Sequence, residues 1–107
     1  MNLPAPVRTY FDADKGPPDR APLTAFAPNA VVEDEGHTHV GHAAIEAWWR
    51  ASKAQYEATA EPLDVREEQD RIIVRAKVTG AFPGSPIVLA FSFRLMNGQI
   101  TDLRIGA

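Results

Sequence analysis

The sequence of 107 residues contains no cysteine. This absence excludes disulfides, thiolate catalysis, and zinc or iron–sulfur sites that cysteine would hold. Basic residues are also few, since 11 Lys and Arg stand against 14 Asp and Glu, and the formal net charge is −3. Because the basic residues form no run or stripe, we do not expect the chain to bind nucleic acid through its phosphates. No apolar run comes near the roughly 20 residues that a membrane-spanning helix needs.

The length leaves room for one domain, residues 1–107, with a single core. Hydrophobic residues make up 45% of the chain and charged residues 23%, which is ordinary for a globular protein. The first six residues have neither the basic nor the apolar region of a signal peptide, so the expected location is the cytoplasm.

The first apolar residues follow a helical spacing. Val7, Tyr10 and Phe11 stand at i, i+3 and i+4, which places them on one face of a helix. The Gly-Pro-Pro sequence at 16–18 should end this helix, because proline lacks the N–H group that would continue it.

A second short helix is expected after these prolines. Asp19 is a plausible N-cap, and Leu23 and Phe26 would form the buried face. Pro28-Asn29 then predicts a turn.

Residues 30–35 predict a strand, because apolar and acidic side chains alternate there. Val32 and Asp34 point to one side of it, and their neighbours point to the other. The stretch 36–41, bounded by glycines, is expected to be a loop.

A longer helix is predicted from about His42 to Tyr56. An apolar stripe along it would face the core, with charged side chains outside the stripe. The stripe comprises Ile45, Trp48, Trp49, Ser52 and Tyr56, and the residues outside it are Glu46, Arg50 and Lys53.

The rest of the chain alternates with the period of β-strands. We expect strands at 59–68, 71–82, 87–95 and 100–105, joined by turns that include a strong hairpin signal at Asn97-Gly98. Helices at the front and an antiparallel run at the back predict an α+β fold, with helices packed on one face of a curved sheet.

Three stretches carry a resemblance to a known family: 7–11, 26–34 with 41–45 behind it, and 93–100. They resemble the SnoaL-like and ketosteroid isomerase-like branch of the nuclear transport factor 2 superfamily, over residues 7–105. The resemblance implies a cone-shaped, curved antiparallel sheet wrapped around helices, the cystatin-like α+β barrel, with an apolar pocket at its open end. It does not fix the reaction, because this fold hosts isomerases, cyclases, dehydratases, epoxide hydrolases and binders without activity.

Asp34 is the first candidate for chemistry. If Val32 packs inward, Asp34 also points into the apolar cone, where lost hydration raises the proton affinity of a carboxylate. Such a group suits a general base that removes a proton from carbon beside a carbonyl. The resemblance implies the same role, since an acid at the matching position does this in steroid isomerases. The alternative is a strand-end Asp that caps the following loop.

Tyr10 is the second candidate, because its helical position faces inward and a buried phenol can donate to an oxyanion. The resemblance implies this role too, and the alternative is a core aromatic. In steroid isomerases a protonated acid completes the oxyanion hole, and the matching position here is Phe91. Since an apolar ring donates no hydrogen bond, steroid isomerisation itself is not expected.

The spacing of His37, His39 and His42 raises the possibility of a metal site. Their polar, glycine-bounded stretch favours a solvated loop instead, so no metal is expected. A single histidine, His39, could assist Asp34 as an acid at the pocket mouth, because imidazole titrates near neutral pH.

Five aromatic side chains are candidates for the pocket wall, with plain core packing as the alternative for each. The candidate substrate-binding residues are Trp48, Trp49, Tyr56, Phe91 and Phe93.

Two functions remain open. The first is a small isomerase, or a polyketide cyclase-like lyase, that works without a cofactor and moves a proton on carbon of an apolar carbonyl substrate. The second is a ligand-binding or dimerisation module of the same fold without catalysis. We expect an apolar small-molecule ligand, no membrane partner, and a homodimer, because Val88 and Ala90 would make part of the outer sheet face flat and small.

Overall fold

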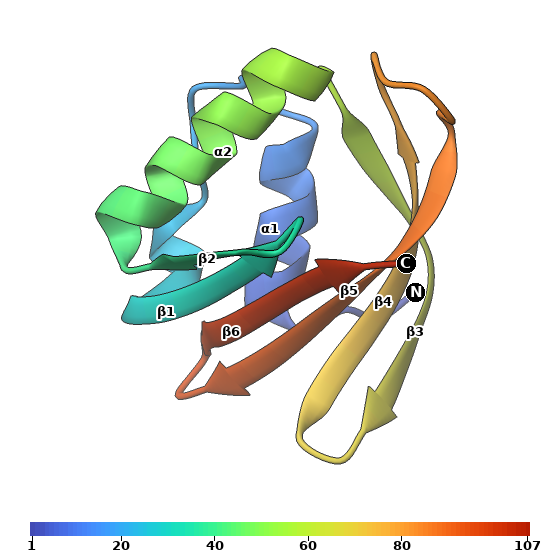
Figure 1. Cartoon of the computed structure of the whole chain (residues 1–107). Coiled ribbons are helices and arrows are strands. Elements are labelled where there is room, and N and C mark those ends of the chain that lie inside the picture. Colours follow the sequence, from blue (N-terminus) through green and yellow to red (C-terminus); the bar gives the residue numbers. More distant parts are fainter.

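A computed structural model describes residues 1–107 as two α-helices, one 3₁₀ turn and a single sheet (Figure 1). The elements run in the order α1 (Ala5–Asp14), η1 (Leu23–Ala25), β1 (Phe26–Asp34), β2 (His37–Val40), α2 (His42–Tyr56), β3 (Thr59–Glu68), β4 (Arg71–Thr79), β5 (Ile87–Met96) and β6 (Gln99–Gly106). The α+β fold predicted from the sequence is confirmed.

The sheet has the strand order β2-β1-β6-β5-β4-β3 and stays open. It bends around α1, and α2 crosses the same concave side (Figure 1). The prediction of an antiparallel sheet is wrong for one pair, because β1 and β6 run parallel. The chain leaves β1 through β2 and α2, builds the β3–β5 meander, and returns with β6 beside β1 in the same direction.

Helix α1 presents the face that the spacing predicts. Val7, Tyr10 and Phe11 are buried, and the prolines at its start fit a helix N-terminus because the first turn needs no N–H donor.

The prediction of a second short α-helix is wrong. Only the 3₁₀ turn at Leu23–Ala25 forms, preceded by Pro22, and Phe26 begins β1 instead of continuing a helix. Pro28 and Asn29, which predict a turn, lie inside β1 with exposed side chains. They are tolerated because the register of β1 against β6 is irregular over this stretch.

The expected loop at 36–41 is also corrected, because β2 forms there and pairs with β1. Glu35 and Gly36 have φ of 53° and 76°, which is the backbone of a tight two-residue hairpin turn. The sequence does not reveal β2, because most of its side chains are exposed and give no alternation of apolar and polar residues.

Helix α2 spans the predicted residues, and Ile45, Trp48 and Trp49 of its stripe are buried. Strand β4 ends at Thr79, short of the predicted Phe82. Gly80 explains the end, because a Cβ there would lie 2.6 Å from the carbonyl oxygen of Tyr56. Glycine thus lets the end of α2 touch the end of β4.

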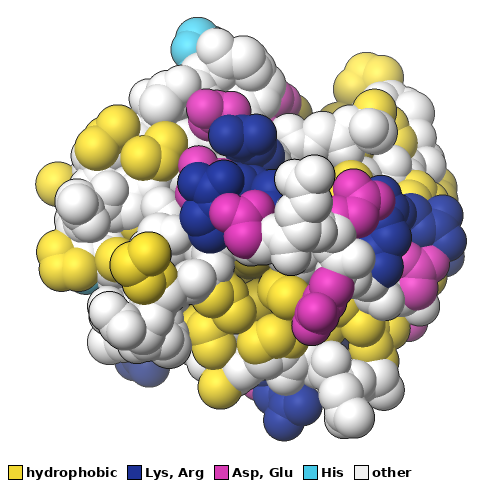
Figure 2. Space-filling view, turned by 90° about the horizontal axis from the view of Figure 1, so that it is seen from below, with side chains coloured by type: hydrophobic (Ala, Val, Ile, Leu, Met, Phe, Trp, Pro, Cys, Tyr) yellow, Lys and Arg dark blue, Asp and Glu magenta, His cyan; other side chains and the backbone are white.

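The outer face of the sheet carries alternating charges. The Arg71 guanidinium lies 2.5 Å from Asp102, and the same group donates to Ser92. Figure 2 shows acidic and basic side chains interspersed with apolar ones on one face of the molecule. Neither helix combines the length and apolar character of a membrane span.

Candidate functional site

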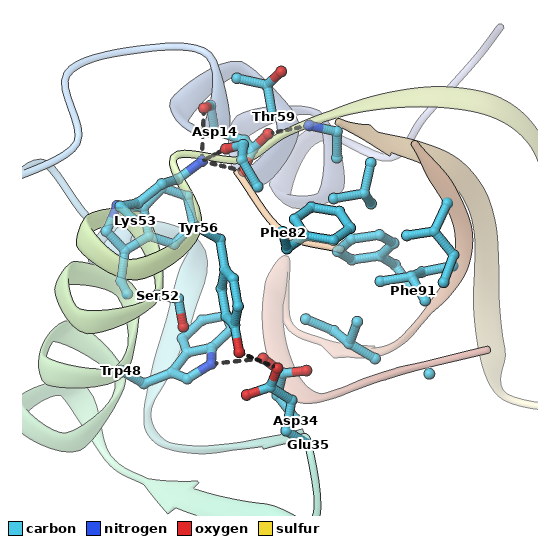
Figure 3. A pocket seen from close by; sticks show the side chains of 18 of the residues that line it. Asp14, Asp34, Glu35, Trp48, Ser52, Lys53, Tyr56, Thr59, Phe82 and Phe91 are labelled. Carbon is cyan, nitrogen blue, oxygen red and sulfur yellow. Dashed lines mark hydrogen bonds and ion pairs between the residues drawn. The ribbon is translucent and has the colours of Figure 1, made fainter. Parts of the chain in front are cut away.

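A cavity of about 500 Å³ lies between α1, the second half of α2 and the concave face of the sheet (Figure 3). Twelve of its 20 lining residues are hydrophobic, so a ligand that fills it must be largely apolar. The aromatic residues of the wall are Tyr10, Trp48, Trp49, Tyr56, Phe82 and Phe91.

Asp34 stands at the end of β1 and lines this cavity, on the same side of the strand as the buried Val32. The indole Nε1–H of Trp48 donates to Oδ2 of Asp34 over 3.0 Å. Burial raises the pKa of Asp34, and the neighbouring Glu35 raises it further. The Trp48 hydrogen bond and the charge of His39 lower that pKa, but burial has the larger effect. The carboxylate is therefore a stronger base than one in water.

Glu35 adds a second acid that sequence reasoning missed. Simple alternation points it away from Asp34, but its positive φ turns the chain, and both residues line the cavity. The Tyr56 hydroxyl donates to Oε1 of Glu35 over 2.6 Å, and this bond raises the pKa of Tyr56. The Tyr56 ring meets Phe82 edge-on. The one sequence signal for the inward direction of Glu35 is the glycine that follows it, because Glu35-Gly36 is compatible with a tight turn.

Tyr10 reaches the same cavity from α1. It is 3% exposed, and its ring packs edge-on against Trp49 and Phe93. Burial, with the charges of Asp14 and Asp34, raises the pKa of Tyr10 well above its usual value. The phenol therefore stays protonated and can act as a hydrogen-bond donor.

A part-buried ion pair closes the other end of the cavity. Lys53 Nζ lies 2.5 Å from Oδ1 of Asp14, and their side chains are 12% and 11% exposed. The same ammonium donates to the carbonyl oxygens of Asp14 and Ala58. The second carboxylate oxygen of Asp14 accepts the Ala60 N–H over 2.6 Å. This pair ties α1 to α2 and β3.

Lys53 was predicted to lie outside the apolar stripe of α2, and this prediction is wrong, because Lys53 lines the cavity. Its stem runs inward and its ammonium lies 5.1 Å from the centre of the Trp49 ring. The charge of Lys53 predicted a side chain in solvent, but the part-buried Asp14 carboxylate gives its ammonium a partner inside.

Four of the five aromatic candidates, Trp48, Trp49, Tyr56 and Phe91, line the cavity. The fifth, Phe93, is fully buried and lies in the core instead. The substrate-binding role of the four stays a prediction.

His39 does not line the cavity. The centre of its ring stands 6.0 Å from that of Trp48, and its charge lowers the pKa of Asp34. His42 shares a hydrogen bond of 2.9 Å with the carbonyl oxygen of Phe26, and His37 is exposed on β2. The three histidines do not form a group that could hold a metal ion.

The fold is an α+β fold, a curved mixed sheet around two helices. Its apolar cavity contains an acid and a phenol, and it is of a size that suits a small molecule. Within this fold class the chain belongs to the SnoaL-like domain family, whose model matches residues 7–103. This confirms the resemblance stated from the sequence.

Solved structures agree. A candidate polyketide cyclase from Sinorhizobium meliloti is 48% identical, with a TM-score of 0.91, and the match covers 96% of this chain and 94% of the other. A protein with a ketosteroid isomerase-like fold from Catenulispora acidiphila, solved in complex with trimethylamine, is 21% identical with a TM-score of 0.84, and the match covers 99% of this chain and 87% of the other. The second likeness shows the fold alone. No curated protein matches the chain.

Proposed function

We propose that this protein is an isomerase or cyclase that needs no cofactor and moves a proton on carbon of an apolar carbonyl compound. The observation that carries the proposal is the Asp34 carboxylate, with its raised pKa and its hydrogen bond from Trp48, in a cavity that also contains the Tyr10 phenol. Base, donor and apolar wall are the parts that such a reaction needs.

In this reaction Asp34 takes a proton from the carbon beside the carbonyl. The electron pair of the broken C–H bond moves to the carbonyl oxygen, which becomes an enolate, and the protonated Asp34 later returns the proton to carbon. Tyr10 donates a hydrogen bond to the enolate oxygen, and its raised pKa keeps the phenol proton in place. His39 lies outside the cavity wall, and its charge lowers the pKa of Asp34, so it favours the ionised form of the carboxylate.

The relative from Sinorhizobium meliloti favours a polycyclic or polyketide-derived substrate, because that protein is named a candidate polyketide cyclase and shares 48% of its residues with this chain. The apolar wall agrees with such a substrate, since fused carbon rings bury well against aromatic side chains.

The alternative is a ligand-binding module of the same fold without catalysis. Phe91 favours it, because this apolar ring lies in the cavity wall where a second acidic donor would complete an oxyanion hole. Under this alternative the cavity binds an apolar ligand and exchanges no protons.

Deuterium exchange at the carbon beside the carbonyl of a cyclic ketone tests the proposal. Asp34→Asn removes the base but keeps an oxygen for Trp48, and we expect exchange to slow by about 100-fold or more. Glu33→Gln is the matched control, because Glu33 is the preceding residue of β1 and lies exposed beside Arg104. Equal rates for Asp34→Asn and the parent protein would remove Asp34 as the base.

We also propose that the chain forms a homodimer through the outer sheet face. Val88 on this face is 45% exposed, and the nearby ion pair of Arg75 with Asp64 would meet the charges of a second copy. Light scattering at micromolar concentration should give the mass of two chains, and the mass of one chain would contradict this.

A further inference from the structure

The charges of the cavity wall do not balance. Three carboxylates line the cavity, Asp14, Asp34 and Glu35, against a single basic side chain, Lys53. Asp14 and Lys53 neutralise each other at 2.5 Å. Asp34 and Glu35 are then left without a basic partner in the wall, side by side at the other end (Figure 3).

The one ammonium of the wall has no hydrogen to offer a ligand. Its three N–H groups are matched by three acceptors within the chain: a carboxylate oxygen of Asp14, the carbonyl oxygen of Asp14 and the carbonyl oxygen of Ala58. A carboxylate or phosphate that entered the cavity would meet two acids and no free cation. An anionic ligand would therefore be repelled.

A cation meets favourable groups instead. Asp34 accepts one side-chain hydrogen bond, from Trp48, and Glu35 accepts one, from Tyr56. Because a carboxylate has about four acceptor positions, each group can accept a further hydrogen bond. The aromatic rings of the wall attract an ammonium group through their faces. The apolar remainder of the cavity suits a hydrocarbon body.

We propose that this cavity selects ligands by charge, favouring an apolar body that carries a protonated amine and rejecting the corresponding carboxylate. The proposal rests on the same cavity as the proposed function, but it concerns binding and does not depend on proton transfer. It narrows the substrate class to compounds without an acidic group.

Three ligands with one hydrocarbon cage test this selectivity: 1-adamantanamine, 1-adamantanol and adamantane-1-carboxylate. Both tryptophans of the chain line the cavity, so their fluorescence reports binding directly. At neutral pH we expect the amine to bind roughly 30-fold or more tightly than the carboxylate, with the alcohol between them. An amine that fails to bind, or that binds no better than the carboxylate, would overturn the proposal.

Variants identify the groups responsible. Glu35→Gln and Asp34→Asn should each reduce the ratio of amine to carboxylate affinity several-fold, and the double variant should bring it close to one. Glu33→Gln removes a charge from the neighbouring position outside the cavity and should leave the ratio unchanged. A double variant that keeps the ratio of the parent protein would contradict the assignment. Because the readout is binding, a chain that discriminates by charge but exchanges no protons would refute only the proposed function.

Discussion

Asp14 and Asp34 line one cavity from opposite ends, and their surroundings differ (Figure 3). Asp14 has an ammonium at 2.5 Å and a backbone N–H at 2.6 Å, and both of its oxygens are used. Asp34 has one indole N–H at 3.0 Å and no basic side chain in hydrogen-bond contact. An aspartate whose carboxylate is fully partnered holds the fold together. Where it is partly partnered, it remains available for chemistry.

The variant with the largest change in stability removes the cation of the Asp14–Lys53 ion pair. Lys53→Met leaves the part-buried Asp14 carboxylate without its cation, so we expect the free energy of unfolding to fall by about 2 kcal/mol. Chemical denaturation measures this. Lys15→Met, on an exposed side chain just after α1 and away from the outer sheet face, should change the same quantity by less than about 0.5 kcal/mol.

A second variant checks the cause. Asp14→Asn added to Lys53→Met removes the unpaired charge while keeping an acceptor for the Ala60 N–H. Much of the lost stability should return. If it does not, Lys53 stabilises the chain by packing on Trp49 rather than by pairing with Asp14.

A second prediction removes the one side-chain hydrogen bond of Asp34. Trp48→Phe deletes the indole N–H that lowers the pKa of Asp34, so this pKa should rise further. The loss of the bond should also cost about 1 kcal/mol of stability. Titration of the Asp34 carboxyl carbon by NMR follows the shift.

Trp49→Phe is the matched control, because the buried Nε1 of Trp49 has no hydrogen-bond partner. It should leave the titration of Asp34 where it is. A similar shift in both variants would mean that the aromatic surroundings, and not the Trp48 bond, set the pKa.

The smallest change we expect is in how the melting temperature depends on pH through Asp34. Burial raises the pKa of Asp34, so the folded state binds this proton more tightly than the unfolded state does. Stability at this group is then greatest below the unfolded pKa and is lost as pH rises through the folded pKa. Asp34→Asn should therefore raise the melting temperature slightly at pH 7 and leave it unchanged near pH 3. A lower melting temperature at pH 7 would contradict the inference.

The long periodic elements could be predicted from the sequence. The bounds of α2 and β3 agree with the predicted ones, because fifteen and ten residues give a periodic pattern enough length to be clear. The short β2 was missed because its four residues are mostly exposed and give too little pattern. The 3₁₀ turn at Leu23–Ala25 was missed because it has only three residues and follows a proline. The parallel pairing of β6 with β1 depends on the path of the whole chain.

The site could be predicted in part. Alternation with Val32 placed Asp34 toward the interior, and helical spacing placed Tyr10 there. Lys53 and Asp14 were missed because their pairing joins residues 39 positions apart, which no local pattern encodes. Glu35 was missed because a turn, not a strand, sets its direction.

The position of β6 has a consequence for how the chain assembles. This last strand lies in the middle of the sheet, with β1 on one side and β5 on the other. A growing polypeptide that still lacks Gln99–Gly106 can form the hairpin of β1 with β2 and the β3–β5 meander, but nothing joins the two pieces edge to edge. Cooperative closure of the sheet must therefore wait for β6, as is expected where distant segments pair. Until then, both unpaired edges are open to pairing with other chains.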